Sequence, residues 1–118
     1  MKTLQIKESL LILFIFILNF KIVFSQDFPN GYFFIRNVAS GKVLDVKDGL
    51  TKTGSSVIIW DRKSINYDNQ LWSYDSGFLI NKASGLVLEV PGYEGGGNIT
   101  PGTDLVINTK REQPESLN

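Results

Sequence analysis

The sequence contains neither cysteine nor histidine. Without cysteine no disulfide can form, so a small domain built from this chain depends on apolar burial and hydrogen bonding. Without histidine the commonest metal ligand and general base is missing. A serine- or cysteine-based catalytic triad would therefore lack its usual base or nucleophile. We expect no metal ion, no cofactor and no enzymatic activity.

The chain also lacks any excess or block of like charge. Lysine and arginine together number 12, aspartate and glutamate also number 12, and the formal net charge is zero. Nucleic acids and anionic membrane surfaces are bound through clustered lysine and arginine. We therefore expect neither of them as a partner.

Long apolar runs are absent except near the N-terminus, where residues 10–18 follow a start carrying Lys2. A positive start, a short apolar core and small residues before a cleavage point are typical of a secretory signal peptide, here with cleavage after Ser25. A membrane anchor is the rival interpretation, but a span needs about 20 consecutive apolar residues and this run is shorter. We expect residues 1–25 to be removed and residues 26–118 to be secreted, with no stable membrane span.

The remainder of the chain nearly repeats itself. Residues 36–46 return as residues 80–90 when Asn37 is aligned with Asn81, a shift of 44 positions. A period of about 20–50 residues indicates copies of one supersecondary unit that must pack on one another. The matched pairs include Asn37/Asn81, Ala39/Ala83, Ser40/Ser84, Gly41/Gly85, Leu44/Leu88 and Val46/Val90, with Asp45/Glu89 matched in charge.

Short runs of β-branched and aromatic residues alternate with turn residues, which predicts an all-β class. After the signal segment, no stretch keeps a helical period over eleven or more residues. Residues 75–77, Asp-Ser-Gly, predict a tight hairpin. The expected strands are residues 32–35, 43–46, 57–60, 70–74, 78–80, 86–89 and 104–108.

A Gln-x-Trp motif at residues 70–72 follows Asn69, and upstream of both lie a Leu-Asp-Val strand and a Val-Ile-Ile-Trp strand. Together with the repeat, this arrangement resembles the ricin B-type lectin family, whose repeat carries the QxW motif. The resemblance covers residues 32–118. It implies a β-trefoil, which is three copies of a four-stranded unit around a pseudo-threefold axis. We place repeat one at about residues 30–75 and an incomplete repeat two at about 76–118.

The last residue, Asn118, aligns with Asn69, one position before the Gln-x-Trp of its copy would begin. We interpret the chain as a trefoil with about two of three repeats, truncated within the second. Such a trefoil would leave axial apolar residues, including Trp72 and Ile80, facing nothing. Self-association is therefore an expected way to cover them.

The resemblance also implies a shallow sugar pocket, in which an aspartate accepts hydrogen bonds from hydroxyls and an aromatic ring stacks on the sugar, assisted by an asparagine and a glutamine. A flat ring removes the CH-rich face of a sugar from water, and a carboxylate is a strong acceptor. Ile58 replaces a polar residue of the family's galactose pocket, so galactose is not implied as the ligand. The matching positions are Asp45, Trp60, Asn69 and Gln70.

The second copy offers a poorer pocket. Glu89 has a longer arm than aspartate, and Asn108 stands at the position of the aromatic ring. Tyr93 is a candidate to stack in its place, which gives a second, doubtful site of Glu89 and Tyr93. The Asn-Ile-Thr sequence that begins at Asn98 is a candidate glycosylation site.

Structural interpretations compete at each position. Trp60 is alternatively a core residue at the end of a buried strand, Asp45 a partner of turn N–H groups, and Gln70 a link between strand ends. The leading hypothesis is a secreted, non-enzymatic module that weakly binds a neutral sugar of a glycan or polysaccharide. The alternative is a structural or protein-interaction trefoil whose sugar site has decayed.

Overall fold

The computed structural model describes residues 2–3, 27–92 and 99–111. In this part of the chain all regular structure is strand or single-turn 3-10 helix, which confirms the predicted all-β class although the 3-10 turns were not predicted. The elements are β1 (Lys2–Thr3), β2 (Phe33–Phe34), β3 (Val43–Val46), η1 (Lys47–Gly49), β4 (Ser56–Trp60), η2 (Asp68–Gln70), β5 (Trp72–Asp75), β6 (Phe78–Asn81), β7 (Val87–Glu89) and β8 (Leu105–Asn108).

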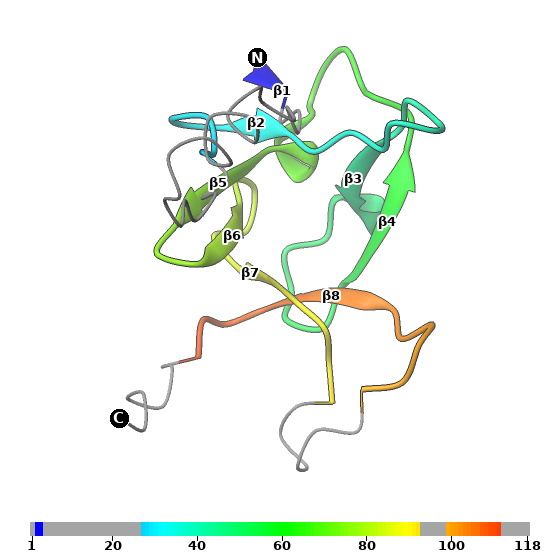
Figure 1. Cartoon of the computed structure of the whole chain (residues 1–118), viewed down its shortest axis with the longest axis vertical. Helices are drawn as coiled ribbons and strands as arrows, with labels where there is room; N and C mark the ends of the chain where they lie inside the picture. The colour runs from blue at the N-terminus through cyan, green and yellow to red at the C-terminus, as the bar shows by residue number, and fades with distance from the viewer. Residues whose placement is uncertain (1, 4–26, 93–98, 112–118) are drawn as a thin grey trace, which may run out of the picture.

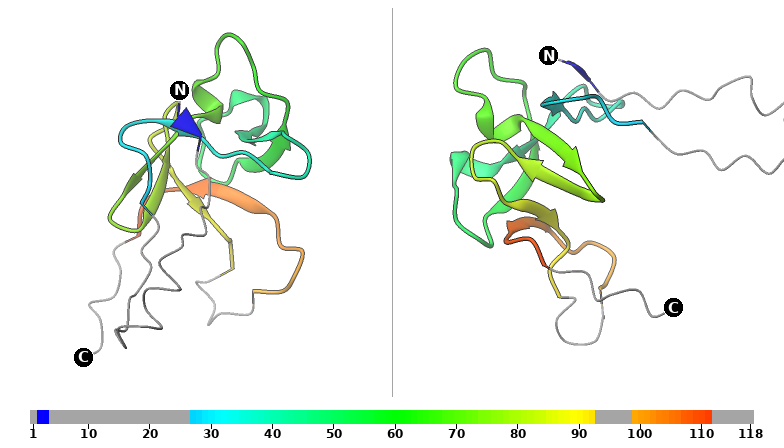
Figure 2. Two further views of the ribbon diagram at one scale, coloured as in Figure 1. Left: turned by 45° about the horizontal axis from the view of Figure 1, so that its top comes forward. Right: turned by 90° about the vertical axis from the view of Figure 1, so that its left-hand side faces the viewer.

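The strands form one sheet in the order β1-β2-β5-β6-β7-β8-β4-β3. The first copy of the repeat supplies β2 to β5, and the second supplies β6 to β8. The two copies meet twice: β5 pairs with β6, and β4 pairs with β8. Consequently the β3–β4 hairpin of the first copy projects from one side of the molecule while β7 and β8 run across its base (Figures 1 and 2).

The two copies have the same strand register. In the first, Val43 is opposite Trp60 and Asp45 is opposite Ile58. In the second, the corresponding pairs are Val87 opposite Asn108 and Glu89 opposite Val106. The structure therefore confirms that Glu89 and Asn108 occupy the positions of the aspartate and the tryptophan.

The turn that opens each copy explains why its residues repeat. In the first copy Asn37 Oδ1 accepts a hydrogen bond from the Ser40 N–H (3.0 Å), and Gly41 has a φ of +73°. The second copy repeats the arrangement at Asn81, Ser84 and Gly85, with a bond of 3.4 Å and a φ of +70°. Asparagine and serine side chains bond readily to nearby backbone, and glycine adopts positive φ without steric cost.

Trp72 lies in the centre of the core, as predicted. It is 0% exposed and packs with Phe33, Val46 and Ile107, and its indole N–H donates to the Leu44 carbonyl at 3.2 Å. The expectation that two repeats leave this ring uncovered is therefore wrong, because side chains from β2, β3, β4 and β8 surround it.

Several predicted boundaries shift. β2 is shorter than the predicted 32–35, and β5 begins at Trp72 because Gln70 ends the η2 turn. The Ser76-Gly77 hairpin is confirmed, since both residues have positive φ, as a tight two-residue turn requires.

Residues Lys2 and Thr3, expected to leave with the signal peptide, pair in parallel with β2 in this structure. The rest of the predicted signal, as well as Tyr93, Asn98 and Asn118, lies outside the described residues. Among the residues that are described, no helix has the length and apolarity needed to cross a membrane.

The two asparagines that open the copies differ in what surrounds them. Asn81 is fully buried, and its Nδ2 donates to the Asn69 carbonyl (3.1 Å) and the Leu71 carbonyl (3.3 Å) of the first copy. Asn37 makes the same turn but is exposed. Asn81 therefore links the two copies, whereas Asn37 serves only its own turn.

The substitution Asn81→Ala should lower the free energy of unfolding by roughly 2 kcal/mol, because it leaves a buried carbonyl without its donor. The matched change Asn37→Ala should cost less than about 1 kcal/mol, since it removes only exposed turn bonds. Urea denaturation followed by tryptophan fluorescence measures both. Equal losses in the two variants would contradict the linking role of Asn81.

Candidate functional site

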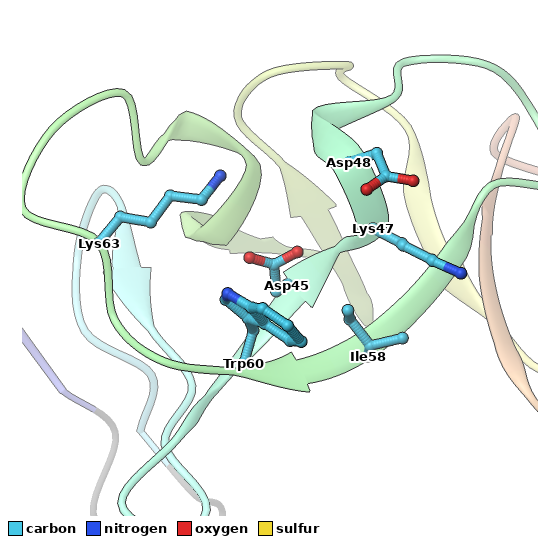
Figure 3. A pocket seen from close by; sticks show the side chains of 6 residues that line it. All are labelled: Asp45, Lys47, Asp48, Ile58, Trp60 and Lys63. Atoms are coloured by element: carbon cyan, nitrogen blue, oxygen red, sulfur yellow. The ribbon is translucent and has the colours of Figure 1, made fainter.

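A surface pocket of about 220 Å³ lies on the β3–β4 hairpin (Figure 3). This volume is below the roughly 300–1,000 Å³ typical of sites for drug-sized molecules, and is suited to one small ring. The residues that line it are Asp45, Lys47, Asp48, Ile58, Trp60 and Lys63.

Strand geometry explains why the key side chains share this face. Residues directly opposite in an antiparallel pair, and residues two apart along a strand, point to the same side. Asp45 is opposite Ile58, and Trp60 is two residues beyond Ile58. The Trp60 side chain is 56% exposed, so the interpretation of it as a core residue is wrong.

Asp45 forms the base of the pocket. The residue is only 3% exposed, its Oδ2 accepts a hydrogen bond from Gln70 Nε2 at 2.8 Å, and its carboxylate faces the hollow (Figure 3). No other described residue donates to this side chain. An ionised carboxylate has about four acceptor positions, so a buried one with a single donor has capacity for donors from a ligand.

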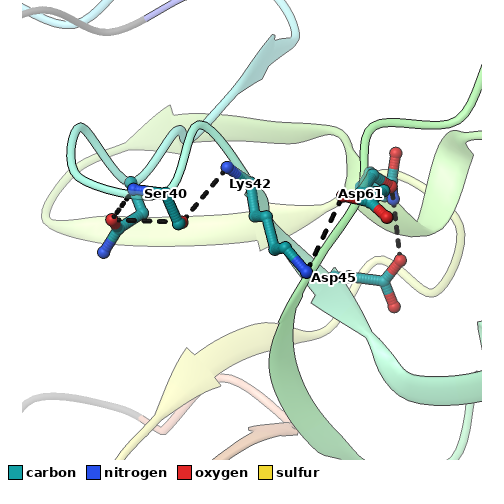
Figure 4. A network of polar contacts seen from close by, with 6 residues as sticks. Ser40, Lys42, Asp45 and Asp61 are labelled. Atoms are coloured by element: carbon teal, nitrogen blue, oxygen red, sulfur yellow. Dashed lines mark hydrogen bonds and ion pairs between the residues drawn. The ribbon is translucent and has the colours of Figure 1, made fainter.

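Gln70 lies beneath the pocket and holds the surrounding backbone in place. It is completely buried and makes three hydrogen bonds. Its Nε2 donates to Asp45 Oδ2 and to the Asp61 carbonyl, at 2.8 Å each, and its Oε1 accepts from the Lys63 N–H at 2.9 Å. Figure 4 shows the polar contacts around Asp45. The amide thus joins β3 to the segment that follows β4. This is the structural role that the sequence left open for it.

Asn69 is also buried beneath the pocket rather than part of its lining. Its Nδ2 donates to the Val46 carbonyl (2.9 Å), and its Oδ1 accepts from Lys63 Nζ (3.0 Å). The structure therefore brings Asp45 and Trp60 to the pocket surface, with Asn69 and Gln70 behind them. Through this contact Asn69 fixes the position of the Lys63 ammonium at the edge of the pocket.

Three lining residues were missed by the sequence reasoning: Lys47, Asp48 and Lys63. Asp48 has a φ of +58°, a left-handed conformation that aspartate tolerates better than most residues. The available signal was the Lys-Asp-Gly turn directly after the Asp45 strand. For Lys63 the signal was a cation three residues after Trp60.

The equivalent positions of the second copy are occupied differently. Arg111 stands three residues after Asn108, as Lys63 does after Trp60, and its Nη2 contacts Glu89 Oε1 at 2.6 Å. The carboxylate is thus paired with a cation of its own chain, and asparagine replaces the ring. Tyr93, the predicted substitute ring, lies outside the described residues.

Within the described ranges, no three side chains of histidine, cysteine, aspartate or glutamate come together as ligands for an ion. What the pocket provides is an exposed ring, an acceptor at its base, and ammonium groups of Lys47 and Lys63 at its edges (Figure 3).

An exposed ring above a hydrogen-bonded carboxylate on a trefoil-like β-scaffold defines a lectin-like domain. Residues 19–108 match the model of the ricin-type β-trefoil lectin domain-like family, and the chain belongs to that family. Over 52 residues it is 42% identical to Mucoricin from Rhizopus delemar, a match covering 44% of this chain and 35% of Mucoricin.

Two solved structures share the fold. The solution structure of the mdaA-1 domain matches with a TM-score of 0.64 and 35% identity over 75% of this chain and 52% of that one. The designed threefold symmetric protein ThreeFoil matches with a TM-score of 0.59 and 27% identity over 74% of this chain and 61% of that one. The chain thus spans about a third of the matching curated relative and less than two thirds of either solved chain.

Replacing Gln70 should weaken both the fold and the pocket. Gln70→Ala leaves Asp45, the Asp61 carbonyl and the Lys63 N–H without their partner, which should cost roughly 2–4 kcal/mol of unfolding free energy. Urea denaturation measures the loss, with Ser64→Ala in the same loop as an exposed control. A cost below that of the control would show that the amide does not anchor the loop.

Proposed function

We propose that this chain is a secreted, non-enzymatic carbohydrate-binding module that holds one neutral sugar ring in the β3–β4 pocket. One observation carries the proposal: an exposed indole and a buried carboxylate with unused acceptor positions line the same small hollow. A sugar ring has one CH-rich face and a rim of hydroxyls, which match these two groups.

Each side chain has a role in this proposal. Trp60 stacks on the apolar face of the sugar, and the free oxygen of Asp45 accepts from its hydroxyls. Lys63, held by Asn69, donates to a hydroxyl at the same end. Gln70 and Asn69 act as positioning residues, because their hydrogen bonds fix the carboxylate and the ammonium. The pocket is shallow and open to water, so we expect a Kd on the order of 0.1–1 mM, about −4 to −5.5 kcal/mol.

Membership of the lectin-like family and the similarity to Mucoricin support binding over catalysis. Glycoside hydrolysis needs two carboxyl groups facing each other across about 5–9.5 Å. Asp45 and Glu89 instead occupy equivalent positions on separate hairpins, and Glu89 is paired with Arg111. The apolar run at residues 10–18 supports secretion, where glycans and polysaccharides are the accessible ligands.

The substitution Trp60→Ala should weaken sugar binding by about 10- to 100-fold, which corresponds to the burial of one aromatic side chain, about 1.5–3 kcal/mol. A glycan array followed by NMR titration of the best ligand measures it. Ile59→Ala is the matched control: Ile59 is also exposed and lies next to Trp60, but its side chain points to the other face of the strand.

If neither the wild type nor the variants bind any sugar, the module is not a lectin. A protein partner insensitive to free sugar would then favour a trefoil with a decayed pocket. If Trp60→Ala and the wild type bind equally, the site lies elsewhere.

The equivalent positions of the second copy should not contribute to binding, because Arg111 forms an ion pair with Glu89 and Asn108 replaces the aromatic ring. Glu89→Gln should therefore leave both the affinity and the stoichiometry of one sugar per chain unchanged within error. Isothermal titration at high protein concentration measures both. A stoichiometry near two that falls to one in this variant would establish a second working site.

A further inference from the structure

Three cations that are far apart in the sequence lie along one face of β2. The guanidinium of Arg62 stands over the Phe34 ring, with its Cζ 4.2 Å from the ring centroid, and the Lys82 ammonium stands over the Tyr32 ring at 5.3 Å. Arg36 follows Phe34 by two residues. We call Arg36, Arg62 and Lys82 the cation row.

Strand alternation places Arg36 on the same face as Phe34. Successive side chains of a strand point to opposite faces. Phe33 and Ile35 pack in the core that contains Trp72, whereas Phe34 belongs to a separate small cluster. Arg36 bridges to β3 through its backbone, so the extended conformation continues and its side chain lies on the Phe34 side. Residues two apart along a strand are about 7 Å apart, which separates Arg36 from the ring beneath the next cation.

A second contact fixes Lys82 at the other end of the row. Its ammonium is 3.3 Å from Asp68 Oδ1 in η2. Tyr67, the residue before, packs on Phe34 with ring centroids 5.6 Å apart. Lys82 and Arg62 therefore approach the same part of the surface from separate segments of the chain.

The row carries more positive than negative charge. Neither Arg36 nor Arg62 forms an ion pair or a side-chain hydrogen bond with another described residue. The carboxylate next to Arg62 in the sequence is Asp61, which pairs with Lys42 at 3.8 Å. Two guanidiniums with unused donors are thus brought together in a chain whose net charge is zero. Folding gathers like charges that the sequence keeps apart.

Two neighbouring guanidiniums favour an anion with more than two oxygens. One arginine fork donates two parallel hydrogen bonds and so matches the two oxygens of a carboxylate. A sulfate ester has three free oxygens and accepts from two guanidiniums at once. Cations repeated along a strand also suit a linear polymer that carries repeated anionic groups.

Nucleic acid is a poorer match for this surface. Single strands bind by stacking their bases on free aromatic faces as well as through their phosphates. Here the Phe34 ring is buried beneath Arg62, and the Tyr32 ring lies beneath Lys82. The rings of the row position cations and offer no free stacking surface.

We propose that the cation row binds the sulfate groups of a sulfated polysaccharide. Arg36 and Arg62 hold one sulfate between their forks, and Lys82, partly neutralised by Asp68, contacts the next anionic group along the polymer. This surface lies outside the β3–β4 pocket, whose lining includes none of the three cations. The inference therefore does not depend on the proposed sugar site.

The experiment measures heparin binding to the full chain by surface plasmon resonance at several NaCl concentrations. Binding should weaken as salt rises, and three cations predict a slope of log affinity against log salt of about −2 on the scale of single strands. Raising NaCl from about 50 to about 200 mM should then weaken binding about 15-fold. Desulfated heparin, which keeps its carboxylates, and neutral dextran should bind at least about tenfold more weakly than heparin.

Two variants locate the site. Arg36→Gln and Arg62→Gln should each weaken heparin binding about three- to tenfold and reduce the magnitude of the salt slope by about 0.7. Arg36→Gln changes an exposed side chain that makes no ion pair or hydrogen bond with another described residue. It therefore tests the proposal even if Arg62→Gln disturbs the packing on Phe34.

Lys52→Gln is the matched control for the loss of one positive charge. Lys52 is exposed in the loop before β4, and this loop is joined to β8 by the hydrogen bond from the Gly54 N–H to the Ile107 carbonyl at 2.8 Å. The variant should keep both the heparin affinity and the salt slope of the wild type.

The other outcomes would overturn the proposal. Absence of heparin binding would exclude the site, and equal losses in Arg36→Gln and Lys52→Gln would show an effect of net charge alone. Binding that is lost in Lys47→Gln and kept in Arg36→Gln would place the sulfate in the β3–β4 pocket. Tighter binding of poly-glutamate or of oligo(dT) than of heparin would exclude a sulfated polysaccharide as the preferred partner. None of these results bears on neutral-sugar binding, which Trp60→Ala tests.

Discussion

The hydrogen bonds of the Gln70 carboxamide are the constraint on which the rest of the site depends. One buried amide reaches the Asp45 carboxylate on β3, the carbonyl of Asp61 after β4, and the N–H of Lys63. The amide itself is fully buried, where an unpaired polar group is costly. The orientation of the carboxylate and the path of the loop are therefore set together, and the exposed ring of Trp60 projects from a backbone that is fixed on both sides.

The internal repeat separates what the fold needs from what the pocket needs. The turn residues that begin each copy are the same and make the same hydrogen bonds. The residues of the hollow differ, with aspartate and tryptophan in one copy and glutamate and asparagine in the other. The pairing of Glu89 with Arg111 shows that an equivalent position can be satisfied within the chain itself. The two copies therefore share the turns of the scaffold without sharing the side chains at the pocket positions.

Much of the fold could be predicted from the sequence, because strand spacing, the glycine turns and the Gln-x-Trp motif all have local physical causes. The burial of Trp72 and the shared pocket of Asp45 and Trp60 were implied by the resemblance to the ricin B-type lectin repeat. The rim of the pocket could not be predicted. Lys47 and Asp48 reach it through a left-handed backbone at Asp48, and Lys63 is directed by a contact with Asn69 that depends on how the loop folds back. The position of Asn69 beneath the pocket depends likewise on tertiary packing, which periodicity does not encode.

The two tryptophans of this chain occupy opposite environments. Trp72 is sealed in the core and Trp60 is 56% exposed on the hairpin. Because the sequence has no third indole, its tryptophan fluorescence comes from one exposed and one buried residue. A soluble quencher such as iodide reaches only Trp60. A molecule bound in the pocket would protect Trp60 from the quencher, and the loss of quenching would measure binding. Unfolding exposes Trp72 to water and shifts its emission to longer wavelength. The two tryptophans therefore report separately on the pocket and on the folded state.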